Sequence, residues 1–104
     1  MISVGQILKL KSGFEREYKR RHDELWPEMA VAMSAAGVNM IIYLHENLLF
    51  LYANAPTQEA WDRLNNDPVT SRWDQYMGDI LESREDGGVF IKDLPRMFKF
   101  GNLA

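Results

Sequence analysis

The stretch VNMIIYLHENLLFLYANA, residues 38–55, determines the fold expected for this chain of 104 residues. Two apolar runs, IIYL and LLFLY, flank the short polar segment His45-Glu46-Asn47. Runs of this length and composition predict strands at 38–44 and 47–55, joined by a tight hairpin. Because both runs are almost continuously apolar, we expect strands that are covered on both faces, or on one face by a second subunit.

The chain before this hairpin has a helical period. Apolar and aromatic side chains recur at spacings of three and four across residues 14–36, which is typical of a helix with one packed face. Pro27 has no backbone N–H and predicts a kink or a split in this helix. We expect Ser12 to cap its start and Gly37 to mark its end.

The chain after the hairpin predicts a second helical segment. A capping pattern, Thr-Gln-Glu-Ala, opens a helix over 57–65. Asp67-Pro68 restarts it, since proline is well suited to the first position of a helix. Residues 83–88 are expected to form a loop.

Two further segments have the character of strands. Residues 2–10 alternate loosely between two faces. The segment MFKF at 97–100 is interpreted as a last short strand, while residues 89–92 are extended or irregular.

This element order, β-α-β-β-α-β, is typical of the ferredoxin-like α+β fold. We expect a single domain over 1–104, with two helical segments on one face of an antiparallel sheet. The strands are too apolar for the other face to meet water, so we expect two sheets to pair in a homodimer, forming a dimeric α+β barrel.

Composition narrows the class of protein. Twelve basic and fifteen acidic residues give a net charge of −3 without a basic stripe, which argues against a nucleic-acid partner. The chain has no cysteine, which excludes disulfides and thiolate metal sites. The N-terminal residues lack the features of a signal peptide, and no apolar run is long enough to span a membrane. We therefore expect an intracellular, cytoplasmic protein.

His22, in the segment YKRRHDELWPEM, is the first candidate for chemistry. Histidine suits general acid–base work at neutral pH. Tyr18 lies one helical turn before it and Trp26 one turn after it. The tyrosine offers a hydrogen bond and the tryptophan an apolar wall. The alternative is a core histidine that is bonded to a backbone carbonyl.

Three other polar groups are weaker candidates. Arg20 and Arg21 suit an anion, but such a pair more often forms a solvated helix face. His45 lies beside Glu46 in the expected hairpin, and without a cluster of spaced ligands it is a weak signal for a metal site.

The segment RWDQYM, residues 72–77, is a second aromatic group. Trp73 suits stacking on the apolar face of a sugar, and Tyr76 suits a hydrogen bond to a hydroxyl. The alternative is that both belong to the packed face of the second helix. Trp61 and Tyr52 are interpreted as core residues.

At EYKRRHDELWPEM, residues 17–29, the sequence resembles the L-rhamnose mutarotase family. The family pattern corresponds here to Tyr18, Arg21-His22 and Trp26-Pro27-Glu28. The likeness continues through IIYLHENLLF, RWDQYM and the terminal LPRMFKF, so it spans almost the whole chain.

The resemblance implies a dimeric ferredoxin-like enzyme that interconverts the α and β anomers of a hexose without a metal or organic cofactor. The resemblance also implies that His22 is the proton donor, that Tyr18 binds a sugar hydroxyl, and that Trp73 provides a stacking surface.

Two positions depart from the family pattern. Asp74 stands where the family often has a second tryptophan, and Met40 stands where it often has an aromatic sugar contact, with Tyr43 nearby. A site lined in this way is expected to accept a more polar sugar, or to bind L-rhamnose more loosely.

Two other classes of function remain open at this point. One is a monooxygenase or haem-binding protein on the same dimeric scaffold, with His22 or His45 as the ligand. The other is a non-enzymatic ligand-binding domain in which His22 belongs to the core.

Overall fold

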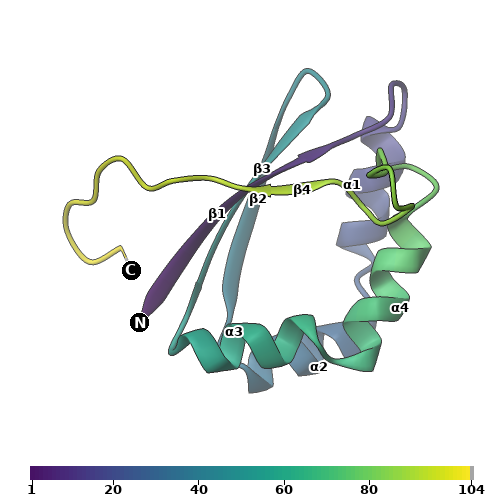
Figure 1. Cartoon of the computed structure of the whole chain (residues 1–104). Helices are drawn as coiled ribbons and strands as arrows, with labels where there is room; N and C mark the ends of the chain where they lie inside the picture. Colours follow the sequence, from purple (N-terminus) through teal and green to yellow (C-terminus); the bar gives the residue numbers. More distant parts are fainter. Residues whose placement is uncertain (104) are drawn as a thin grey trace.

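The computed structural model describes residues 1–103 and has an α+β fold, in which a curved sheet carries all the helices on one side (Figure 1). Four strands and four helices follow one another along these residues: β1 (Ile2–Lys9), α1 (Glu15–Asp23), α2 (Pro27–Ala35), β2 (Asn39–His45), β3 (Leu48–Ala55), α3 (Gln58–Asn65), α4 (Pro68–Met77) and β4 (Ile91–Asp93).

The sheet has the strand order β2-β3-β1-β4, and every neighbouring pair is antiparallel. The predicted hairpin is present as β2 and β3, in which Ile42 lies opposite Leu51. On the other side of β3, Leu49 lies opposite Leu8 of β1. This order confirms the ferredoxin-like class that the sequence predicts.

Prolines divide each helical segment into two helices, as predicted. Pro27 opens α2, and the extended backbone of Trp26, with a ψ of 132°, separates α2 from α1. Pro68 opens α4, where the side chain of Asp67 accepts a hydrogen bond from the N–H of Val69 at 2.9 Å. The two helical segments thus cover the sheet as bent layers.

Gly37 ends α2, as expected. Its φ of 70° lies in the left-handed region, and an added Cβ would lie 2.8 Å from Cγ of Pro56. The N–H of Val38 then donates to the carbonyl of Met33 at 3.1 Å, which closes the helix end. Only glycine therefore fits between α2 and β2.

Two local predictions are wrong. Ser12 does not cap α1: the residue before the helix is Phe14, and no side chain caps its first turn. Residues 97–100 form no strand. The last strand is β4, and Pro95 follows soon after it; because proline has no N–H to donate, it cannot extend the ladder.

The segment after β4 leaves the sheet and projects away from the helices (Figure 1). Its side chains are almost fully exposed, with 89% of Met97, 81% of Phe98 and 82% of Phe100 open to solvent. Although its sequence pattern is strand-like, this segment pairs with no strand among the described residues.

The core lies between the sheet and the helices. Its largest fully buried side chains come from the loops, the sheet and α4: Leu10, Leu49, Met77 and Ile80. Trp61 is buried there, as predicted. Tyr52 instead lies on the opposite face of the sheet, because its register partner is Gly5 and it alternates with the core residues of β3.

Residues 1–103 contain neither a membrane-spanning helix nor a cluster of metal-ligating side chains. No helix there is both long enough and apolar enough to cross a membrane. No group of three or more histidine or acidic side chains in this part of the chain is placed to hold a metal ion.

Candidate functional site

A cavity of about 810 Å³ lies between the inner face of the sheet and helices α1 and α4. This size is typical of pockets for small ligands. One helical stripe of α1, including Tyr18 and His22, forms part of its wall, and the stripe of Thr70, Trp73 and Asp74 on α4 forms another. Residues of β2 complete the lining, so three elements far apart in the sequence meet at one site.

His22 is half-buried in this wall and contacts two aromatic rings. Its imidazole stacks on Tyr18 with ring centroids 4.3 Å apart, and it meets Trp73 edge to face at 5.3 Å. Tyr18 lies four residues before His22, so the helix itself stacks the two rings. The packing leaves the imidazole few orientations other than the one observed.

A hydrogen bond selects the tautomer of His22. Nδ1 of His22 lies 3.1 Å from the backbone oxygen of Tyr18. A carbonyl oxygen only accepts hydrogen bonds, so Nδ1 carries the hydrogen and the neutral ring has its lone pair at Nε2. Burial lowers the pKa of His22 below its usual value, against the opposing effects of the Tyr18 carbonyl and of Asp23. The imidazole therefore favours the neutral, proton-accepting form.

Trp73 belongs to a cluster of aromatic rings. The cluster joins Trp73 to Trp26 at 5.1 Å and to Tyr76 at 5.5 Å, and Trp26 lies 5.2 Å from Tyr76. Trp26 is not among the residues that line the cavity. It lies beside Trp73 and supports that ring, so the structure gives it a place in the wall but no contact with the cavity.

Tyr18 is buried, and the loss of solvent raises the pKa of its phenol far above the usual value. The hydroxyl therefore stays protonated at all physiological pH values. A neutral phenol can donate one hydrogen bond and accept others. His22, Tyr18 and Trp73 thus combine a proton acceptor, a hydroxyl and an aromatic ring in one wall.

Comparisons with known proteins identify the family of the chain. The family model described as L-rhamnose mutarotase matches residues 3–100. The chain belongs to the L-rhamnose mutarotase family.

Individual relatives support the same assignment. The chain is 36% identical over 101 residues to the L-rhamnose mutarotase of Listeria monocytogenes, covering 94% of this chain and 97% of that protein. It is 38% identical over 94 residues to that of Agrobacterium fabrum, covering 88% of each. The crystal structure of an L-rhamnose mutarotase from Formosa agariphila matches with a TM-score of 0.82 and 27% identity, covering 97% of this chain and all of that one.

The two positions that depart from the pattern of the L-rhamnose mutarotase family both border the cavity. Asp74 is exposed overall, yet partial burial of its carboxyl raises its pKa. Burial is the only cause of this shift, and no hydrogen bond to the Asp74 carboxylate from another group within residues 1–103 contributes to it. Met40 lies opposite Ala53 on the inner face of the sheet and is also exposed there. Asp74 is thus a hydrogen-bond acceptor that is free to meet a ligand.

Tyr43 also borders the cavity. However, it lies opposite Phe50, and strand alternation directs its side chain to the opposite face from Met40 and Ile42. The structure therefore brings Met40 and Asp74 to the cavity but directs most of the Tyr43 side chain away from it.

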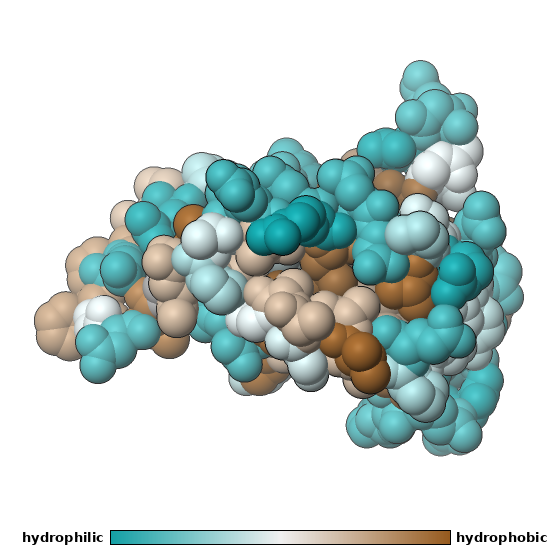
Figure 2. All heavy atoms as spheres, turned by 90° about the horizontal axis from the view of Figure 1, so that it is seen from below, coloured by the Kyte–Doolittle hydropathy of each residue, from teal (hydrophilic) through white to brown (hydrophobic). Residues whose placement is uncertain are grey.

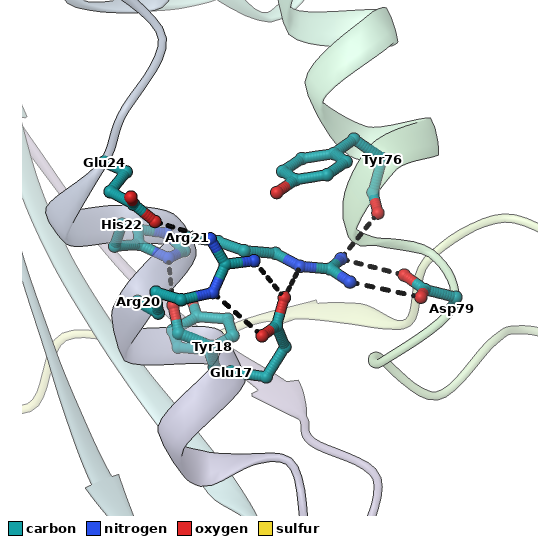
Figure 3. Close-up of polar contacts among 8 residues, drawn as sticks. All are labelled: Glu17, Tyr18, Arg20, Arg21, His22, Glu24, Tyr76 and Asp79. Atoms are coloured by element: carbon teal, nitrogen blue, oxygen red, sulfur yellow. Dashed lines mark hydrogen bonds and ion pairs between the residues drawn. The ribbon is translucent and has the colours of Figure 1, made fainter.

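The prediction of a solvated arginine pair is correct for Arg20 and wrong for Arg21. Arg20 is exposed, whereas Arg21 is buried and reaches from α1 to Asp79, beyond the end of α4 (Figure 3). The sequence does contain a signal: Arg21 lies four residues after Glu17 and three after Tyr18, at the border of the apolar stripe. That spacing alone does not show that Asp79 lies within reach.

His45 does not belong to this site. It is exposed in the hairpin, where its Nε2 lies 3.8 Å from a Glu46 carboxylate oxygen, and it is not among the residues that line the cavity. Only His22 of the two histidines borders the cavity, so His45 is not placed to bind a haem or another ligand there.

Proposed function

We propose that this protein is an isomerase that interconverts the α and β anomers of a monosaccharide, with L-rhamnose as the substrate. Membership of the L-rhamnose mutarotase family supports this reaction. The observation that carries the proposal for the site is the imidazole of His22, which presents Nε2 beside Trp73 in a largely apolar cavity.

The reaction moves one proton between two oxygens of the sugar, and one histidine is sufficient for this transfer. In our proposal, neutral His22 accepts the proton of the anomeric hydroxyl at Nε2. The bond between C1 and the ring oxygen breaks, C1 becomes an aldehyde, and the imidazolium donates its proton to the ring oxygen. Rotation about the C1–C2 bond then turns the other carbonyl face toward the oxygen, and the reverse steps close the ring as the other anomer.

The remaining walls hold the sugar during this exchange. We assign to Tyr18 a hydrogen bond to a sugar hydroxyl, because its phenol stays neutral beside the imidazole. Trp73 supplies the stacking surface. Asp74 accepts a hydrogen bond from a second hydroxyl, while Met40, with the edge of Tyr43, closes the sheet side of the cavity. Fixed geometry of this kind raises the rate by keeping the reacting atoms aligned.

Saturation-transfer NMR of the anomeric protons of L-rhamnose tests the reaction directly. Wild-type protein should accelerate exchange between the α and β signals, and His22→Gln should reduce this acceleration by at least about 100-fold. Glutamine is suitable because it can still donate to the Tyr18 carbonyl but has no titratable group. An unchanged rate in His22→Gln would reject the proposed role of His22, and a wild type inactive on L-rhamnose would reject the substrate.

We also propose that the protein is a homodimer that pairs through the outer face of the sheet. That face carries the exposed apolar side chains Ile41, Tyr43 and Phe50. Figure 2 shows a second apolar region on the projecting C-terminal segment, which contains Met97, Phe98, Phe100 and Leu103. Exposed apolar side chains gathered in this number are typical of a protein–protein interface.

Sedimentation of the purified protein tests this assembly. Wild type should sediment as a dimer, and Ile41→Lys should be monomeric, because a lysine in the centre of the paired sheets would lose its hydration. Val31→Lys is the matched control, since Val31 is an exposed apolar residue on α2, outside the sheet. A monomeric wild type, or a dimeric Ile41→Lys, would exclude this interface.

A further inference from the structure

Arg20 and Arg21 are neighbours in the sequence but have different environments. The side chain of Arg20 is 54% exposed and pairs with Glu17 and Glu24 on its own helix. The side chain of Arg21 is 10% exposed. A buried guanidinium is retained only where several hydrogen bonds compensate for its lost hydration. The contacts of Arg21 therefore indicate a specific role.

The contacts of Arg21 extend from α1 to the end of α4 (Figure 3). Its Nη1 donates to the carbonyl of Tyr76 at 2.8 Å and to Oδ1 of Asp79 at 2.8 Å, while Nη2 donates to Oδ2 of Asp79 at 3.2 Å. Behind this fork, Nε donates to Glu17 at 2.6 Å. The carbonyl of Tyr76 belongs to the last turn of α4, where helix carbonyls lack partners and attract positive charge.

The same guanidinium also contacts the cluster of aromatic rings that includes Trp73. It lies 4.4 Å from the ring centroid of Tyr76. The Tyr76 ring packs against Trp73, and Trp73 in turn meets His22 edge to face. Arg21 is thus the residue next to His22 on α1 and also the residue that holds the end of the helix bearing Trp73.

We propose that Arg21 is a positioning residue that fixes α4 against α1, so that Trp73 and Tyr76 stay at a constant distance from His22. This inference rests on the proposed mutarotase function. Arg21 does not border the cavity, so it does not touch the sugar. It acts through its neighbours by holding the stacking ring and the proton-transfer group in one arrangement, and small displacements of such groups reduce catalysis strongly.

The charges of this contact persist over the pH range in which His22 works. The hydrogen bond from Arg21 lowers the pKa of Asp79 below its usual value. The Asp79 contact likewise raises the already high pKa of Arg21. Protonation of His22 therefore occurs while Arg21 and Asp79 remain paired.

The first test measures L-rhamnose exchange in Arg21→Met, with Arg20→Met as the matched control. We expect kcat of Arg21→Met to fall by about 10- to 100-fold, and both kinetic constants of Arg20→Met to stay within about twofold of wild type, since exposed ion pairs contribute little. Arg21→Lys should recover only part of kcat, because lysine keeps the charge without the two-pronged geometry. Rates are normalised to the folded fraction from urea denaturation.

A second measurement does not depend on activity. The indole N–H signals in NMR spectra report on the three tryptophans separately. Arg21→Met should shift the signals of Trp73 and Trp26, while the signal of Trp61, which lies on α3, should remain in place. If wild type were inactive, this result would still establish the positioning contact, so failure of the proposed function can be distinguished from failure of the inference.

Asp79→Asn covers the case in which Arg21→Met does not fold. Asp79 is exposed, so its replacement weakens the contact without leaving a cavity. It should lower kcat and shift the Trp73 signal in the same direction, by a smaller amount. The inference is overturned if folded Arg21→Met or Asp79→Asn has the kcat and KM of Arg20→Met, or if the Trp73 signal does not move.

Discussion

The two faces of the sheet are both apolar, but they differ in what their own chain places against them. On the inner face, α1 and α4 surround a cavity in which His22, Asp74 and the phenol of Tyr18 interrupt the apolar wall. On the outer face, Ile41, Tyr43 and Phe50 are exposed. Apolar surface with a few polar groups that converge on a cavity suits a small ligand, whereas open apolar surface suits a partner chain.

The largest expected contrast is in stability, when one large aromatic residue is truncated on each side of the sheet: Trp73 of α4 on the inner side and Phe50 of β3 on the outer side. Trp73→Ala should lower the free energy of unfolding by about 3–5 kcal/mol, since it empties a buried site between three rings. Phe50→Ala should lower it by only about 1–2 kcal/mol in the monomer, because the ring is partly exposed already. Urea denaturation at a concentration where the protein is monomeric checks both values. Equal losses would contradict the proposed difference between the faces.

Acidification should lower both activity and stability through protonation of His22 in the cavity. Because burial lowers its pKa, the neutral base persists to a lower pH than for an ordinary histidine, and activity should fall only below about pH 6.5. Below its pKa, kcat should decrease about tenfold per pH unit. The unfolded chain binds the proton more readily than the folded one, so stability should also fall on acidification in this range.

The measurement is a pH profile of enzymatic exchange, corrected for the spontaneous reaction, together with an NMR titration of His22. The two curves should share one midpoint. A midpoint of the NMR titration above the ordinary histidine value would show that the imidazole is stabilised as a cation, and would contradict the proposed effect of burial.

Asp74→Asn tests the free carboxylate in the cavity. If the carboxylate accepts a hydrogen bond from a sugar hydroxyl, its neutral replacement should raise KM for L-rhamnose by about tenfold with little change in kcat. Gln75→Asn is the matched control, because the next residue of α4 does not border the cavity. An unchanged KM in Asp74→Asn would remove this residue from the binding site.

The smallest effect is expected at Tyr52. Its hydroxyl is buried and has no hydrogen-bond partner within residues 1–103. Removal of this hydroxyl breaks no hydrogen bond, so Tyr52→Phe should leave the free energy of unfolding unchanged or raise it by less than about 1 kcal/mol. Thermal denaturation of wild type and Tyr52→Phe measures this difference. A clear loss of stability would reveal a partner for this hydroxyl, such as one supplied by a second copy at the outer face.

Much of the fold was predictable because its signals are local. Strand runs, the helical period before Pro27, the cap at Thr57 and the helix end at Gly37 act within a few residues, so the sequence predicts them correctly. The segment 97–100 shows where this reasoning fails. It has a strand-like pattern, but pairing requires a neighbouring strand, and the chain has already turned away from the sheet after Pro95.

The candidate site shows the same division. The sequence by itself determined that Tyr18 and His22 lie on successive turns of one helix, and its likeness to L-rhamnose mutarotases singled out His22 and Trp73. The prediction that Trp26 lies one helical turn after His22 is wrong, because α1 ends at Asp23 and the backbone of Trp26 is extended. Only the tertiary structure decided that Trp26 stands beside the cavity wall and that Arg21 is buried against Asp79. The physical reason is that these contacts join residues far apart in the sequence, such as Arg21 and Tyr76, 55 positions apart, whose proximity arises only when α1 and α4 pack together.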